Sequence, residues 1–165
     1  MIFTIKKGKH YSDNFVYKFF HFFNFASNIF YKVTFNQSCK YELEGEDKYD
    51  INKLIGFSRG LHHKESARFG WRYSSKDDCI ELFAYCYVSG NRTYKKICNI
   101  ELNREAILEI AKNKNYYTFR VFQGISTYVF TIDSESKFPF GYRLWPYFGG
   151  NRKAPHDMVI ELEII

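Results

Sequence analysis

Apolar and polar side chains alternate along most of this chain, and this period of two limits the fold more than any other feature. Successive side chains of a β-strand point to opposite faces, so alternation predicts strands that are buried on one side. We expect the apolar positions of these runs to face a core: residues 29–35, 67–73, 80–88, 117–121, 128–132, 144–148 and 158–164.

The order of these segments predicts an all-β fold. Roughly ten short strands with turn signals between them, and no regularly alternating helices, favour an antiparallel sandwich or barrel. The 165 residues suit one domain, residues 1–165, without a linker or an internal repeat. We expect one or two short helical turns, one from Asp50 to Leu54 and one from Asn103 through Ile107 to Ile110.

Ser89, Gly90 and Asn91 separate two alternating runs and predict the loop of a hairpin. A three-residue loop places Val88 opposite Arg92 and Leu82 opposite Cys98. In that register Cys86 faces Tyr94 rather than Cys98, which argues against a disulfide between the two cysteines. The four cysteines, Cys39, Cys79, Cys86 and Cys98, lack C-x-x-C spacing and are interpreted as buried free thiols.

Aromatic residues make up 21% of the chain and are concentrated in residues 15–25. That run is compatible with a membrane-contacting edge, an oligomer interface or a central strand buried on both faces, and we favour the buried strand. No apolar run approaches the roughly 18 residues that a spanning helix needs, so no membrane span is predicted. The polar residues 41–53 predict a surface loop.

The chain carries a net charge of +6, which favours an anionic partner without identifying it. Nucleic acid is the weaker candidate, because neither an RNP-like motif nor a basic helix is present. The N-terminus lacks the apolar stretch and cleavage site of a signal peptide, so we expect either an intracellular, by default cytoplasmic, chain or one whose leader was removed.

Two segments carry a resemblance to known families. Residues 143–151, Arg-Leu-Trp-Pro-Tyr-Phe-Gly-Gly-Asn, precede Ala154-Pro155-His156-Asp157-Met158 and a final alternating strand. This ending resembles that of concanavalin-like jelly rolls of the laminarinase type, which implies an antiparallel β-sandwich. The middle segments 52–58, 62–63 and 66–72 resemble a bacterial family that has no assigned function.

The enzymes of that superfamily imply two activities, and the sequence departs from the motifs of both. Laminarinase-type hydrolases carry Glu-x-Asp-x-x-Glu on one strand face, because retaining hydrolysis needs paired carboxylates. Here Glu81 shares its face with Phe83, Tyr85 and Tyr87, so the second carboxylate is missing. The similar alginate lyases use Arg, Gln, His and Tyr on a concave sheet. Residues of these types occur in this chain, but the motifs do not.

Arg68 and Arg72 are four residues apart in an alternating segment, so both side chains point to the face opposite that of Ala67 and Trp71. Rings that stack on sugars and guanidinium groups that bind carboxylates could form a platform there. Its predicted members are Arg68, Arg72, Glu81, Tyr85, Tyr87, Arg143, Trp145 and Tyr147. The alternative is that these side chains form ordinary cross-strand pairs on a solvated sheet.

Other polar clusters predict no metal or cofactor site. His62 and His63 are adjacent and point to opposite sides of an extended chain, while Asp77, Asp78 and Asp133 lack the spacing of a calcium loop. The turn at Gly149 and Gly150 lacks the Gly-Lys-Ser/Thr of a phosphate loop. Asp157 is interpreted as a cap that accepts backbone N–H groups where the final strand begins, rather than as a catalytic partner of His156.

These observations favour a non-catalytic protein that binds an acidic or polar glycan on the platform. A first alternative is a polysaccharide lyase or glycoside hydrolase with an atypical motif, in which Tyr147 or His63 transfers the proton. A second is a structural or interaction protein, such as a virion or accessory subunit, whose aromatic surface packs on a protein partner or on a second copy.

Overall fold

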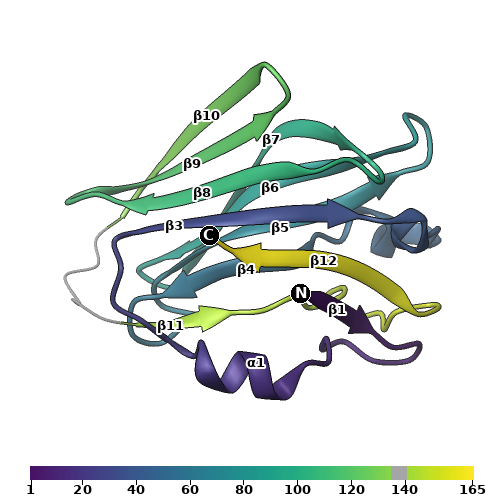
Figure 1. Ribbon diagram of the computed structural model, residues 1–165, viewed down its shortest axis with the longest axis horizontal. Coiled ribbons are helices and arrows are strands. Elements are labelled where there is room, and N and C mark those ends of the chain that lie inside the picture. The colour runs from purple at the N-terminus through teal and green to yellow at the C-terminus, as the bar shows by residue number, and fades with distance from the viewer. Residues whose placement is uncertain (135–140) are drawn as a thin grey trace.

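A computed structural model describes residues 1–134 and 141–165, where the strands form two antiparallel sheets packed face to face (Figure 1). The first sheet contains, in spatial order, β1 (Ile2–Ile5), β12 (Met158–Ile164), β3 (Asn28–Phe35), β8 (Ala106–Lys112), β9 (Tyr116–Gln123) and β10 (Ser126–Asp133). The second contains β2 (Phe23–Asn24), β11 (Gly141–Leu144), β4 (Asn52–Ser58), β5 (Ser66–Ser74), β6 (Cys79–Val88) and β7 (Asn91–Glu101). The predicted all-β antiparallel sandwich is confirmed.

Most of the alternating runs bury the faces that were predicted, but Leu144, expected to face the core, pairs with Gly56 on the outer side of its sheet. Every second residue of β3 is buried, and in β5 and β12 the inward residues, among them Trp71 and Leu162, are almost fully buried. Side chains from both sheets meet in one continuous core, as is expected of a sandwich. Tyr128 was expected in this core but is 38% exposed, because β10 is the edge strand of its sheet.

Short helices occupy other places than predicted: α1 (Phe15–Phe20) and the 3-10 turns η1 (Gln37–Cys39) and η2 (Gly45–Tyr49). Both expected helical turns are wrong. Asp50 ends η2 and its carboxylate accepts from the Gly150 N–H at 3.1 Å, while β4 begins two residues later. Asn103 takes a left-handed φ of 58° in the connection between β7 and β8. Pairing of the buried strands overrides the weak helix caps in both segments.

The β6–β7 hairpin turns on two residues, not three. Ser89 and Gly90 have φ of 49° and 85°, both left-handed, as a type I′ turn requires. Val88 therefore faces Asn91, and Tyr87 rather than Val88 faces Arg92. A register shift between Leu82 and Phe83 restores the predicted pairing of Leu82 with Cys98. The predicted register is thus correct beyond this irregularity and wrong by one residue near the turn.

The four cysteines are free thiols and buried, which confirms their interpretation. Burial raises the pKa of the Cys39 thiol to about 12 and that of Cys98 to about 11. It also raises the pKa of Cys86 and of Cys79. Thiolates are the reactive form of cysteine, so these side chains act as small apolar core residues.

The aromatic run is not a buried strand, which corrects the expectation for residues 15–25. It forms α1, which lies outside both sheets at one edge of the sandwich (Figure 1), followed by the two-residue strand β2. The partly buried side chains are Tyr17, Lys18 and His21. The rings of Tyr17 and His21 stack at 4.1 Å between centroids, and Lys18 Nζ donates to the Ser12 carbonyl oxygen. None of the helices in the described residues has both the length and the apolar character to cross a membrane.

Candidate functional site

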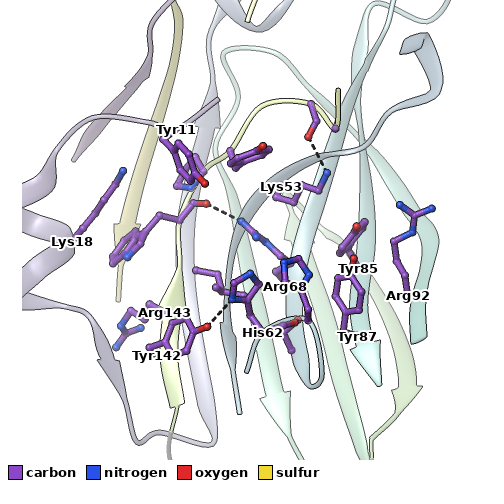
Figure 2. Close-up of a pocket in the computed structure, with 18 of the residues that line it drawn as sticks. Tyr11, Lys18, Lys53, His62, Arg68, Tyr85, Tyr87, Arg92, Tyr142 and Arg143 are labelled. Atoms are coloured by element: carbon purple, nitrogen blue, oxygen red, sulfur yellow. Dashed lines mark hydrogen bonds between the residues drawn. The ribbon is translucent and has the colours of Figure 1, made fainter. Parts of the chain in front are cut away.

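A cavity of about 510 Å³ opens on the outer face of the second sheet (Figure 2). Alternation places it there: Ala67 and Phe69 of β5 are buried in the core, whereas Arg68 between them points outward, opposite Tyr85 of β6 and Gly56 of β4. The segment after β11 forms the other wall, because Tyr147 and Lys53 exchange backbone hydrogen bonds at 2.8 and 2.9 Å.

Arg68 lies in the floor of the cavity. Its Nη2 donates to the Trp145 carbonyl oxygen at 2.8 Å, whereas its buried Nε has no hydrogen-bond partner among the described residues. Burial lowers the pKa of this guanidinium to about 10, so it keeps its charge at neutral pH. A Cβ at Gly56 would meet the Ala67 carbonyl oxygen at 2.1 Å, so glycine allows the close approach of β4 to β5 beneath Arg68.

Lys53 adds a second cation beside Arg68. Its Nζ donates to the Gly149 carbonyl oxygen at 2.9 Å and lies 5.5 Å from the ring centroid of Tyr85 and 5.8 Å from that of Tyr147. Burial, followed by the charge of Arg68, lowers the pKa of Lys53 to about 8, although the Asp50 carboxylate opposes the shift. The ammonium group is thus held between two aromatic faces.

Tyrosines form one side of the site. The rings of Tyr85 and Tyr87 meet at 6.1 Å and 68°, and Tyr94 of β7 stacks on Tyr85 at 6.2 Å and 14°. Arg92, opposite Tyr87 on β7, is exposed at the rim. Burial raises the pKa of Tyr85 to about 12, so its hydroxyl stays neutral and donates or accepts hydrogen bonds rather than acting as a base.

His62 and Tyr142 form a hydrogen-bonded pair on the opposite side, where Figure 2 shows their side chains pointing toward one another. His62 Nδ1 lies 2.6 Å from the Tyr142 hydroxyl oxygen, and the rings of His62 and His63 are 4.1 Å apart. Burial, then the charges of His63 and Arg68, lower the pKa of His62. The neutral imidazole, which can accept the tyrosine proton, is therefore favoured.

The structure brings Arg68, Tyr85, Tyr87 and Tyr147 together around the cavity on the outer face. Arg143 of β11 and Trp145, just after it, also line the cavity, but their side chains lie on the core side of the sheet. Arg143 pairs with the buried Phe57, and the Trp145 ring stacks on Phe3 at 5.7 Å. These two belong to the edge of the core rather than to an outer platform.

Arg72 and Glu81 share the predicted face but lie outside this cavity. They are cross-strand partners, and Arg72 Nη2 lies 2.6 Å from the Glu81 carboxylate, which Lys96 also contacts at 2.7 Å. Both line a separate groove of about 420 Å³ that also contains Tyr49. Arg72 and Glu81 thus form an ordinary cross-strand pair on the surface of the sheet, which is the alternative to a ligand-binding role.

Sequence reasoning missed Lys53, Arg92 and Tyr142 as members of the site, and it considered His62 only as a metal ligand. A two-residue reading of the Ser89–Gly90 turn would have placed Arg92 beside Tyr87. The position of Lys53 depends on a register shift between Lys53 and Gly56 that alternation does not reveal. Tyr142 required the pairing of β11 with β2 and β4, which are distant in sequence.

The charged side chains that line the cavity are all basic. Its described residues include Lys53, Arg68 and Arg92 but neither aspartate nor glutamate. Such a site can bind a carboxylate, sulfate or phosphate through charge-assisted hydrogen bonds while rings contact apolar faces of the ligand. Three His, Cys, Asp or Glu side chains do not converge anywhere in the described part of the chain, so no candidate metal site is found there.

Known proteins match this chain in their structures but not in their sequences. No family model and no curated protein matches its sequence. An alginate lyase from Klebsiella pneumoniae matches with a TM-score of 0.60 and 10% identity over 84% of this chain, which spans 59% of the lyase. A functionally unknown protein from Saccharomyces cerevisiae matches with a TM-score of 0.54 and 12% identity, over 88% of this chain and 69% of its own.

A GH43 protein from Bacillus licheniformis matches with a TM-score of 0.50 and 11% identity, over 97% of this chain and 30% of its own. At such identities the likeness establishes the fold and nothing further. The chain shares the antiparallel β-sandwich fold of these structures, which is the fold that its C-terminal segment predicts.

Proposed function

We propose that this protein binds an acidic glycan in the cavity beside β11. One observation carries the proposal: the described lining combines five basic side chains with several tyrosine rings and contains no carboxylate; the basic residues are Lys18, Lys53, Arg68, Arg92 and Arg143. A uronate or sulfate group placed against Arg68 and Lys53 would receive charge-assisted hydrogen bonds.

The rings give the proposed ligand its second chemical feature. Tyr85, Tyr87 and Tyr147 present aromatic faces and hydroxyl groups within one cavity. The C–H faces of a sugar ring pack on such surfaces, and its hydroxyl groups find donors and acceptors there. An alginate lyase and a GH43 protein among solved structures of the same fold are consistent with a glycan ligand.

Binding to an acidic oligosaccharide tests the proposal directly. Oligo-alginate, titrated calorimetrically at low salt, should bind the wild-type protein, whereas a neutral xylo-oligosaccharide should bind far more weakly. Arg68→Met should lower the affinity about tenfold or more, because a hydrogen bond to a charged group contributes about 1.5–3 kcal/mol.

Arg104→Met is the matched control, since Arg104 pairs with Glu101 at the surface, away from the cavity. Thermal unfolding of each variant verifies that it folds, and Arg92→Ala at the exposed rim provides a second test if Arg68→Met does not. Equal affinity of all variants, or equal binding of the neutral sugar, would refute the proposal.

A second candidate function is β-elimination of a uronate, favoured by the His62–Tyr142 pair in the same cavity. In that reaction a base removes the proton from the carbon next to the carboxylate, and the electron pair of that C–H bond forms a C=C bond as the C–O bond to the glycosidic oxygen breaks. The leaving oxygen takes up a proton, so no other reactant is needed. Arg68 would neutralise the carboxylate, and neutral His62 or the tyrosine would transfer the proton. Tyr147 and His63, the earlier candidates, lack such a hydrogen-bonded partner among the described contacts.

Ultraviolet absorbance of the unsaturated product distinguishes the two functions. A lyase produces a steady increase with alginate or another polyuronate, and His62→Gln abolishes the increase while leaving oligosaccharide binding within a few fold. An unchanged absorbance together with measurable binding supports the non-catalytic function.

A further inference from the structure

Lys53 of β4 combines an accessible position with surroundings that disfavour its charge. Its side chain is half-buried in the lining of the cavity, and its Nζ lies 5.5 Å from the ring centroid of Tyr85 and 5.8 Å from that of Tyr147. Among the described residues this Nζ donates to the Gly149 carbonyl oxygen at 2.9 Å. An ammonium group carries three N–H donors that water satisfies fully, so these surroundings favour the neutral amine.

The charges around Lys53 add to the effect of burial. Arg68 and Arg92 disfavour a proton on Nζ, whereas the Asp50 carboxylate favours it. Asp50 is not among the residues that line the cavity, and its carboxylate accepts the Gly150 N–H at 3.1 Å. Burial, followed by the charge of Arg68, lowers the pKa of Lys53 to about 8, so roughly one tenth of the side chain is neutral amine at about pH 7.

A desolvated lysine amine beside a second cation is a nucleophile toward carbonyl carbons. After the ammonium group loses a proton to water, the nitrogen electron pair forms a bond to the carbonyl carbon. The two remaining amine protons leave with the carbonyl oxygen as water, and a C=N bond remains, so no other reactant is needed. The imine takes up a proton, and the resulting cation lies between the rings of Tyr85 and Tyr147 as the ammonium group does.

Arg68 adds recognition of a carboxylate beside that carbonyl carbon. Figure 2 shows its guanidinium group near Lys53, and its charge reaches Nζ strongly enough to lower the pKa of the lysine. Arg68 keeps its own charge at neutral pH, because its pKa is about 10. A guanidinium group binds a carboxylate through charge-assisted hydrogen bonds. The two side chains together match a small molecule whose carboxylate and carbonyl groups are adjacent, which is a 2-oxo acid.

We propose that Lys53 captures small 2-oxo acids as an imine while Arg68 holds the carboxylate. This covalent capture goes beyond glycan binding and does not require it, because the same cations bind an acidic sugar without reacting. A captured 2-oxo acid would occupy the cations that the proposed glycan needs, so the two ligands would exclude one another.

Reductive trapping tests the capture without any sugar. The wild-type protein is incubated at about pH 7 with glyoxylate and sodium cyanoborohydride, which reduces an imine to a stable amine, and peptide mass spectrometry measures the modification of each lysine. Lys53 should be modified about tenfold or more above the exposed Lys114 of the same chain, because each unit by which a pKa falls toward the working pH raises the fraction of free amine about tenfold.

Acetaldehyde, which lacks the carboxylate, isolates the contribution of Arg68. The ratio of modification by glyoxylate to modification by acetaldehyde should be about tenfold higher at Lys53 than at Lys114, because a hydrogen bond to a charged group favours the anionic aldehyde. Arg68→Met should reduce the ratio at Lys53 to the value at Lys114. Removing the arginine charge changes the fraction of free amine equally for both aldehydes, so the ratio reports carboxylate binding alone.

Arg104→Met is the matched control and should leave both ratios unchanged, since Arg104 pairs with Glu101 away from the cavity. Circular dichroism verifies that each variant folds. Modification of Lys53 no greater than that of Lys114 in the wild-type protein would overturn the proposal. Equal aldehyde ratios at the two lysines, which also need no variant, would overturn the part assigned to Arg68. Both results leave the calorimetric test of glycan binding unaffected, so the failure of one proposal is distinguishable from the failure of the other.

Discussion

At the scale of single residues, Lys53 shows how the cavity acquires its chemistry. Its ammonium group lies between the rings of Tyr85 and Tyr147 and donates a hydrogen bond to the Gly149 carbonyl oxygen. Water supplies more hydrogen bonds to an exposed ammonium than this environment does, so the folded protein holds the charge at a cost. A bound anion would remove part of that cost.

Replacing Lys53 should therefore stabilise the unliganded protein near neutral pH. The folded pKa of about 8 lies below the usual value of 10.5, so from pH 8 to 10.5 the unfolded chain binds more protons and this contribution to stability rises with pH. After allowance for solvent screening, Lys53→Met should raise the free energy of unfolding by about 1–2 kcal/mol at pH 7.

Urea unfolding at about pH 7 and pH 10 measures this effect, and the gain from Lys53→Met should shrink at the higher pH. Lys114→Met, at an exposed lysine, should change little at either pH. A gain from Lys53→Met that is the same at both pH values would contradict the assigned cause.

Arg68 and Tyr85 could be placed from sequence because alternation alone puts them on one face. Arg143 and Trp145 could not be placed from sequence. The backbone between Leu144 and Tyr147 is irregular, so the alternation that puts Tyr147 on the outer face does not carry over to these two residues. Alternation predicts which face of a sheet a side chain points to only within one uninterrupted strand. Much of this site lies where strands shift register or end.

At the scale of elements, the aromatic run shows where prediction of strands from alternation fails. Residues 15–25 are apolar at nearly every position, so they fit a buried strand and a helix equally well. Tyr17 and His21, four residues apart and stacked in the structure, carry the helical spacing. The β6–β7 register was missed by one residue for a related reason, because a local irregularity in pairing leaves no mark in the alternation.

The two-residue turn of that hairpin predicts opposite effects of two substitutions. Gly90 has a φ of 85°, so Gly90→Ala should lower the free energy of unfolding by about 1–2 kcal/mol. Ser89, at 49°, pays a conformational penalty that asparagine tolerates better, so Ser89→Asn should raise stability by a few tenths of a kcal/mol, about 0.5. Chemical denaturation decides both signs, and stabilisation by Gly90→Ala would show that the turn has another conformation.

At the scale of the whole molecule, a buried carboxylate connects the two sheets. Glu65, just before β5, accepts the Tyr117 hydroxyl of β9 at 2.9 Å and the Ser134 hydroxyl after β10 at 2.8 Å. Glu65 is 7% exposed, so these hydrogen bonds are shielded from water. The sequence predicts the sandwich through its strands, but a single polar contact between the sheets depends on their relative placement and could not be predicted.

Removing this connection should destabilise the sandwich. Glu65→Ala leaves two buried hydroxyl groups without their acceptor and should lower the free energy of unfolding by about 3 kcal/mol or more. Glu65→Gln keeps a carbonyl oxygen in place and should lose only about 1 kcal/mol. Urea unfolding followed by tryptophan fluorescence compares the two, and equal losses would mean that the hydroxyl groups do not depend on this acceptor.

The protonated, buried state of all four native thiols makes the molecule convenient for site-specific labelling. At neutral pH a maleimide reacts with thiolate, which Cys39, Cys79, Cys86 and Cys98 scarcely form. A cysteine introduced at the exposed position Phe20 would therefore take up a fluorophore selectively in the otherwise unmodified chain. Its emission would report directly on whether that position leaves water.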